Sequence, residues 1–398
     1  MRTLSADQGL AGAVARLSLA EPGDSVEDIA SNVVGLHNTA QPTPYLSIRA
    51  RRNGFERSEL DELMWGTWQL ARLRAMRLTM FVFPRDLLEV AAAATRHISE
   101  PLAARWLADS GLTPAEFERL ADAVDEALGE GPLTSRALRR TLGVPQSVDL
   151  PGVVSRMCDV GRLVGGAPPR SWRSGVRQYH RWSDVLPEVD LHRWKADDAI
   201  RELVRRYVGS YGPVTVDDIS WWTGFTKARS RLALEGLDVE EVAVADWPGP
   251  LYRTGGDPVA ADPGNAVRAL PLLDPYVQGY RDRGRFLDPK RNGFVYDGGG
   301  NSAATLVHRG LIIGVWQPSD RPETSIRYHL FGDQPELVRR AAADDLAAAG
   351  RLYFDRPVDV IEITEMLPLR AGGGRSASHP LDSTVHRASR RAPDAAVP

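Results

Sequence analysis

Four polar side chains that can hold a water molecule lie almost side by side near the start of the chain. They close the apolar segment VVGLHNTAQ and are His37, Asn38, Thr39 and Gln41. A Pro-Thr-Pro break follows, and then a predicted helix with three arginines, Arg49, Arg51 and Arg52. Because guanidinium groups bind phosphate through forked hydrogen bonds, water-binding and phosphate-binding groups are neighbours here. This pairing indicates chemistry on a nucleic acid.

The composition is that of an ordinary globular protein with room for two to four compact modules. The 398 residues are 43% hydrophobic and 25% charged, and no apolar run approaches the roughly 18–20 residues that a membrane span needs. No apolar core follows a basic region at the N-terminus, so we expect no secretory signal. The single cysteine, Cys158, excludes an intrachain disulfide and a thiolate metal cluster. We therefore expect a cytoplasmic protein.

The chain is not strongly basic, but its cationic residues are almost all arginine. The net charge is −3, which argues against a uniformly basic coat for nucleic acid, and only three of the 49 cationic residues are lysine, at Lys195, Lys227 and Lys290. An arginine excess of this kind is typical of a GC-rich genome. Arginine nevertheless supplies phosphate-binding donors wherever it clusters.

Three segments share one predicted pattern of helices followed by β-rich residues and a Gly or Pro turn. In the first, Ser25 is a candidate N-cap, and the apolar spacing from Val26 to Leu36 predicts a helix that Pro42 and Pro44 end. Helices over Tyr45–Arg52 and from Ser58 to Gly66 follow, and then the strands of a wing between Leu70 and Phe83. Repetition of this pattern predicts tandem winged helices, although any α+β protein with three similar helical layers would also fit.

The other two units repeat the order with different residues. Thr113 and Thr134 are candidate caps in the second unit, with strands near 161–164 and 178–182, and the third unit runs from Asp197 to Tyr252. A β-rich region from about 269 to 330, a helix over 335–349 and the strand VDVIEI complete the fold. We therefore predict an α+β protein of tandem winged-helix units with a β-rich C-terminal region.

The predicted boundaries divide the chain into six parts. They are an N-terminal extension (1–24), winged helix 1 (25–100), winged helix 2 (101–190), winged helix 3 (191–262), a β-rich C-terminal region with a helix (263–369) and a disordered tail (370–398).

Four segments in this order resemble a known bacterial family. They are LHNTAQPTPYLSIRAR, RLRAMRLTMFVFPRDL, LPLLDPYVQGYRDR and LIIGVWQ. Together they resemble the winged-helix DNA-binding family that includes the DNA glycosylases of the azinomycin-resistance type, which excise bulky alkylated purines and crosslinks. The resemblance covers roughly residues 25 to 367. It implies a DNA-binding enzyme of DNA repair or of self-resistance to a genotoxin, and we expect the protein to be a monomer.

The resemblance also points to catalytic residues. The catalytic motif of the family's glycosylases resembles Gln-x-Gln, which places His37 on the first glutamine and Thr39 on the second. We expect neutral His37 to accept a proton from the attacking water and Thr39 to position that water, with Asn38 or Gln41 as alternates. A histidine beside Asn and Thr at a helix end also often only caps free backbone carbonyls, and this alternative stays open.

The lack of lysine before Lys195 bears on the type of glycosylase. Enzymes that also cut the strand need an amine nucleophile, so we predict a monofunctional DNA glycosylase that hydrolyses the N-glycosidic bond of bulky or cationic N-alkylated purines in duplex DNA. The alternative is a non-catalytic winged-helix DNA-binding protein, regulatory or architectural; a member of the fold with neither activity is a third reading.

Several further side chains are candidates for DNA contacts. We expect Arg74 and Arg77 on the wing to contact phosphate, with two helix faces as backbone-binding surfaces. The predicted DNA-binding residues are Gln41, Arg49, Arg51, Arg52, Arg74, Arg77, Arg136, Arg139, Arg140, Lys227, Arg229 and Arg283. The helix faces could equally be ordinary solvated surfaces.

Two remaining motifs have structural interpretations. The segment LLDPYVQGYRDR, Leu272 to Arg283, could line a site or bind a phosphate, but we favour a buried ion-pair knot between the β-rich region and the winged helices. Trp221 and Trp222 are expected in the core. The histidines show no metal-ligand spacing and no phosphate-binding glycine loop is present, so we expect no metal or other cofactor. The expected partner is double-stranded DNA in the nucleoid, with no membrane and no obligatory protein partner.

Overall fold

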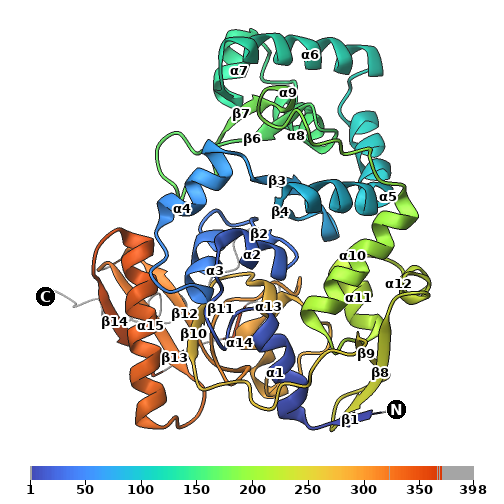
Figure 1. Ribbon diagram of the computed structural model, residues 1–398. Coiled ribbons are helices and arrows are strands. Elements are labelled where there is room, and N and C mark those ends of the chain that lie inside the picture. The colour runs from blue at the N-terminus through green and yellow to red at the C-terminus, as the bar shows by residue number, and fades with distance from the viewer. Residues whose placement is uncertain (1, 322, 365, 367, 370–398) are drawn as a thin grey trace, which may run out of the picture.

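The structure is a computed structural model that describes residues 2–321, 323–364, 366, 368 and 369. Helices and four small sheets make up this part of the chain (Figure 1), so the predicted α+β class is confirmed. The predicted tail, 370–398, lies outside the described residues. Among the described helices, none has the length and apolar character needed to cross a membrane.

The first helical unit alternates helices and strands around a three-stranded antiparallel sheet. Its strands lie in the order β2-β4-β3. Ser25 caps the first helix, as predicted, by accepting a hydrogen bond from the Asp28 backbone N–H. The elements are α2 (Val26–Asn32), β2 (Leu36–His37), α3 (Thr43–Arg51), α4 (Arg57–Asp61), which continues as a π-helical turn over Glu62–Gly66, β3 (Leu70–Arg74) and β4 (Met80–Pro84).

The second helical unit has the same order of elements and the same strand order, β5-β7-β6. Thr113 and Thr134 cap its helices as predicted. Its elements are α6 (Pro114–Ala127), β5 (Leu133–Thr134), α7 (Ser135–Thr141), α8 (Leu150–Asp159), β6 (Leu163–Gly165) and β7 (Gln178–Arg181), followed by the short helix α9 (Trp182–Val185).

The third helical unit repeats the order once more, with a single bridge from Val214 to Tyr252 where the others have a first strand. It comprises α10 (Ala196–Tyr211), α11 (Val216–Thr223), α12 (Lys227–Leu234), β8 (Val239–Val244) and β9 (Leu251–Thr254). Strand β1 (Arg2–Leu4) adds to β8 in parallel.

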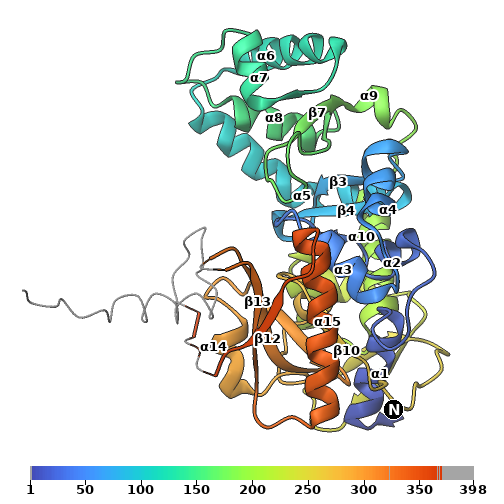
Figure 2. The ribbon, with the colours of Figure 1, turned by 90° about the vertical axis from the view of Figure 1, so that its left-hand side faces the viewer.

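The C-terminal region is a five-stranded sheet covered by a long helix. Its strands are β10 (Val267–Leu270), β11 (Ala304–His308), β12 (Leu311–Ser319), β13 (Ser325–Leu330) and β14 (Asp359–Glu362), in this order across the sheet. Helix α15 (Glu336–Phe354) packs along the sheet (Figure 2), and the short helices α13 (Pro275–Gln278) and α14 (Asn292–Val295) lie between β10 and β11 in the sequence. The predicted β-rich region and following helix are therefore confirmed.

The three helical units do not all belong to one hydrophobic core. The first and third helical units, α1 (Ala6–Arg16) and much of the C-terminal region contribute to one large core, whereas the second helical unit has a separate core of its own. Helix α5 (Arg85–Asp109) runs from the first unit to the second, which lies at the top of the molecule in both views (Figures 1 and 2).

The segment that contains His37 differs from the prediction. The predicted helix ends at Asn32, and residues 36–37 form strand β2. The reason is a sharp turn in which Val34 and Gly35 both have positive φ angles, 54° and 98°. A β-carbon at Gly35 would lie 2.3 Å from the Phe83 ring, so only glycine fits here. His37 is therefore a strand residue and does not cap a helix end.

Candidate active site

Strand β2 positions His37 at the edge of the first unit's sheet. Its neighbours in the sheet are Phe81 and Met80 of β4: His37 pairs with Phe81, whose ring centroid is 5.0 Å from the imidazole, and the Asn38 N–H donates to the Met80 carbonyl at 2.7 Å. The Thr39 N–H donates to His37 Nδ1 over 3.4 Å. With Nδ1 as the acceptor, the neutral ring carries its proton on Nε2.

Burial decides the charge of His37. The side chain is only 7% exposed. Burial, reinforced by the positive charge of Arg77 and partly offset by Asp274, lowers the pKa of His37 to about 4. The imidazole is therefore neutral at physiological pH.

Two amide side chains near His37 are buried, and three of their polar atoms have no hydrogen-bond partner in the described part of the chain. Asn38 is 1% exposed and Gln41 is 6% exposed. Within the described residues, Asn38 Oδ1, Asn38 Nδ2 and Gln41 Oε1 form no hydrogen bond. Such groups destabilise a fold unless they are retained for a ligand or a water. Thr39, by contrast, is exposed.

Two of the predicted DNA contacts are structural instead. Arg51 is completely buried and forms a two-pronged ion pair with Asp274, at 2.7 and 2.8 Å. Arg49 donates to both carboxylate oxygens of Asp345. Guanidinium groups with these partners and so little exposure have no free surface for a phosphate, so the prediction was wrong for both. The ion-pair interpretation of Asp274 is confirmed.

Four of the other predicted basic residues contact partners within the protein, and three more differ in their exposure. Arg52 pairs with Glu59, Lys227 pairs with Asp217, Arg74 reaches Ser155 and Asp159 of the second unit, and Arg139 donates to carbonyls of the loop after α7. The arginine that follows in sequence, Arg140, is exposed on α7, as is Arg136, whereas Arg229 is half-buried on α12. DNA binding by all these residues stays a prediction, except for Arg139, whose guanidinium group donates to carbonyls of the loop after α7.

Arg77 and Arg283 come together at a place that the sequence did not indicate. Both approach Trp221 of α11: the Arg77 Cζ lies 3.9 Å and the Arg283 Cζ 5.6 Å from the indole ring. Trp221 is half-buried here, so its predicted place in the core was wrong, whereas Trp222 is a core residue. Arg77 lies 144 positions before Trp221, and Arg283 lies 62 positions after it, so local sequence carries no signal for this cluster.

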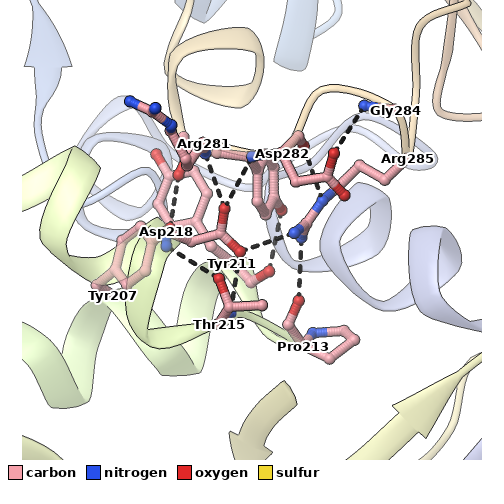
Figure 3. Close-up of polar contacts among 11 residues, drawn as sticks. Tyr207, Tyr211, Pro213, Thr215, Asp218, Arg281, Asp282, Gly284 and Arg285 are labelled. Carbon is pink, nitrogen blue, oxygen red and sulfur yellow. Dashed lines mark hydrogen bonds and ion pairs between the residues drawn. The ribbon is translucent and has the colours of Figure 1, made fainter. Parts of the chain in front are cut away.

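A buried carboxylate fixes the segment that contains Arg283. Asp218 of α11 accepts hydrogen bonds from the backbone N–H of Arg281 at 2.7 Å and from Arg285 Nη2 at 2.7 Å (Figure 3). The same carboxylate accepts the Thr215 N–H at the start of the helix. Asp218 is fully buried and the Arg285 side chain is only 1% exposed. The third unit and the C-terminal region are thereby joined next to Trp221.

The arrangement can hold water beside an uncharged imidazole and bring cationic groups close to it. No group of three or more His, Cys, Asp or Glu side chains in the described residues is arranged to hold a metal ion.

Comparisons with known proteins agree with this picture. The family model for AlkZ-like DNA glycosylases matches residues 30–353. The interstrand DNA cross-link repair glycosylase of Streptomyces sahachiroi is 23% identical over 352 residues, which are 82% of this chain and 90% of the relative. The solved structure of the Streptomyces sahachiroi DNA glycosylase AlkZ has the same fold, with a TM-score of 0.73 and 19% identity over 91% of this chain and all of that chain. The protein belongs to the AlkZ-like DNA glycosylase family.

Proposed function

We propose that this protein hydrolyses the N-glycosidic bond of N-alkylated purines in duplex DNA, and that the segment from His37 to Gln41 is its active site. The observation that supports the site most strongly is the buried Asn38 amide and the buried Gln41 Oε1, both without hydrogen-bond partners in the described structure, beside a neutral histidine. Family membership supports the reaction type.

The substrate class follows from the chemistry of the site. A purine alkylated at N7 carries a positive charge and leaves without a general acid, and the sugar left behind is itself cationic. A neutral His37 adds no positive charge next to these cations. Amide oxygens such as Asn38 Oδ1 and Gln41 Oε1 stabilise positive charge and accept hydrogen bonds from water. Cationic adducts are therefore the preferred substrates, and a preference for bulky adducts stays a prediction.

The geometry revises the division of labour among the site residues. Because Nδ1 of His37 accepts the Thr39 N–H, its Nε2 is a hydrogen-bond donor rather than a base. We assign the water to the amides of Asn38 and Gln41, with His37 orienting it. Thr39 holds the ring through its backbone and lies at the exposed rim. The proton of the water leaves to solvent after the attack.

We also propose that the three helical units are winged helices, with the boundaries predicted above. The shared order of elements and the shared strand orders, β2-β4-β3 and β5-β7-β6, support this assignment. The exposed arginines Arg136 and Arg140 on α7 would then contact the DNA backbone. The protein would act as a monomer on duplex DNA in the nucleoid.

Interstrand crosslinks are a further candidate substrate. The support is the name of the relative from Streptomyces sahachiroi, an interstrand DNA cross-link repair glycosylase. A monofunctional mechanism stays the prediction made from the lysine-free sequence before Lys195.

The test is base release from a duplex with one N7-methylguanine and, separately, one N7-linked crosslink. The products are analysed by mass spectrometry of the free base and by gel electrophoresis before and after hot alkali. We expect free base, strand breaks only after alkali and no adduct trapped by borohydride. Binding to duplex DNA without release from either substrate would support the non-catalytic DNA-binding alternative instead.

A further inference from the structure

Three arginine side chains from two distant segments converge on one indole ring. The Cζ atoms of Arg77, Arg281 and Arg283 lie 3.9, 5.4 and 5.6 Å from the centre of the Trp221 ring. Arg283 also lies 3.5 Å from the centre of the Tyr296 ring. Aromatic faces attract guanidinium groups, so the indole acts as a platform that holds the cations together.

The backbone fixes this cluster from several sides. Arg77 lies in the tight turn between β3 and β4 with a φ of 52°. Asp218, one helical turn before Trp221, holds the backbone at Arg281 (Figure 3). A β-carbon at Gly300, where φ is 79°, would lie 2.8 Å from the indole and 3.0 Å from Arg283 Nη2. The backbone that carries Arg77, Arg281 and Arg283 is thus fixed around the indole ring before any ligand arrives.

The cluster has more positive charge than its surroundings neutralise. Within the described part of the chain, none of the three guanidinium groups forms an ion pair with a carboxylate, and Arg283 Nε is buried without a hydrogen-bond partner. Burial lowers the pKa of both Arg77 and Arg283, and Arg283 lowers that of Arg77 further. An anion in this place would relieve the repulsion among the three cations.

A hollow of about 540 Å³ lies beside the cluster and gives an anion access. Trp221, Arg281 and Arg283 line it together with the glycine turn 298–300. Two carboxylates also line the hollow, but both already accept backbone hydrogen bonds: Asp282 from Gly284, and Asp297 from Gly299 and Asn301. Neither carboxylate forms an ion pair with the three guanidinium groups in the described structure, although the negative charge of Asp297 acts to raise the pKa of Arg283.

We propose that Arg281 and Arg283 bind one phosphate of the DNA backbone in this hollow, and that Arg77, held on the Trp221 ring, adds positive charge beside it. This inference rests on the proposed function and adds the part of the substrate that the cluster holds. The turn that carries Arg77 leads into β4 at Met80, whose carbonyl accepts the Asn38 N–H. The phosphate is therefore held next to the reaction segment and sets the register of the lesion. Trp221 carries the Arg77 guanidinium on its ring and is not a stacking surface for a base.

The test is the salt dependence of binding to a fluorescein-labelled duplex that contains one N7-methylguanine. Each phosphate neutralised by the protein contributes about −0.9 to the slope of log K against log salt. The double variant Arg281→Gln/Arg283→Gln is expected to lose about one unit of slope and to bind about tenfold more weakly at low salt. Arg281→Gln alone is expected to lose part of the slope and part of the low-salt affinity. This single variant should fold normally because the Arg281 side chain is exposed and makes no hydrogen bond in the described structure.

A matched control is Arg340→Gln, which removes an exposed arginine of α15 that pairs with Glu336. It is expected to keep the wild-type slope. A series of duplexes with single neutral methylphosphonates then locates the phosphate. At one position, the methylphosphonate is expected to weaken DNA binding by the wild-type protein but not by the double variant. The series needs no further protein variants, and the melting temperature of each variant checks its fold.

Two results would overturn the inference. One is a double variant with the slope of Arg340→Gln, and the other is a methylphosphonate series with no position specific to the wild type. If the cluster bound free inorganic phosphate instead of the DNA backbone, the double variant would likewise keep the slope of Arg340→Gln. These outcomes do not depend on base release, so a protein that binds DNA but releases no base would refute the proposed function and leave the phosphate site standing.

Discussion

The protonation state of His37 determines which chemistry the segment from His37 to Gln41 supports. A protonated imidazole would repel a cationic purine, whereas the buried, neutral ring does not. The role predicted from the sequence, a base that deprotonates water, does not fit a ring whose Nδ1 accepts the Thr39 N–H. The buried amides of Asn38 and Gln41 suit the water better.

This account predicts the pH dependence of base release. The pKa of His37 is lowered from its usual value near 6.5 to about 4, so the ring keeps its neutral form as the pH falls through 6.5. The single-turnover rate, corrected for uncatalysed loss of base, should be level from pH 8 to about 5 and should fall only towards pH 4. A loss of activity centred near pH 6.5 would show that His37 titrates normally and would sink this account of the site.

Among the secondary-structure elements, strand β2 is the one that places the site. Helix caps such as Ser25 and Thr113 depend on residues three positions away and could be predicted from the sequence. Strand β2 could not, because it exists only through its pairing with β4, more than 40 residues further on. The apolar spacing from Val26 to Leu36 therefore resembled one continuous helix.

Gly35 gives a test of how β2 is placed. Gly35→Ala puts a methyl group into contact with Phe83 in a left-handed backbone conformation, and we expect a loss of about 2–4 kcal/mol in the free energy of unfolding. The matched control is Gly54→Ala, where φ is 65° but no atom lies within 4 Å of the added carbon. It should cost only about 1 kcal/mol of backbone strain. Equal costs in urea unfolding would contradict the close packing of this turn.

For the whole molecule, buried ion pairs join parts that are distant in the sequence. Arg51 and Asp274 join the first unit to the C-terminal region, and Asp218 and Arg285 join the third unit to it. The sequence favoured a knot at Asp274 because of its unusual density of charged and phenolic residues. It could not identify Arg51 as the partner, 223 positions away, and so Arg51 was assigned to DNA.

This view predicts a large difference between two neighbouring arginines. Arg51→Met leaves the Asp274 carboxylate buried without its partner, and we expect about 3–5 kcal/mol of lost stability in urea unfolding. Arg52→Gln removes a partly exposed pair with Glu59 and should cost no more than about 1 kcal/mol. Comparable losses for the two variants would argue against the buried pair as the main link between these parts.

The most direct measurement of the central claim is the single-turnover rate of base release from N7-methylguanine duplex for Asn38→Ala beside the wild type and Arg340→Gln. All three proteins are used at concentrations that saturate the DNA, so that binding does not limit the rate. We predict a loss of about 100-fold in Asn38→Ala, because the amide that holds the water is gone, and no loss in Arg340→Gln. An Asn38→Ala variant that is folded, bound to DNA and as fast as the wild type would contradict the assignment of the active site to this segment.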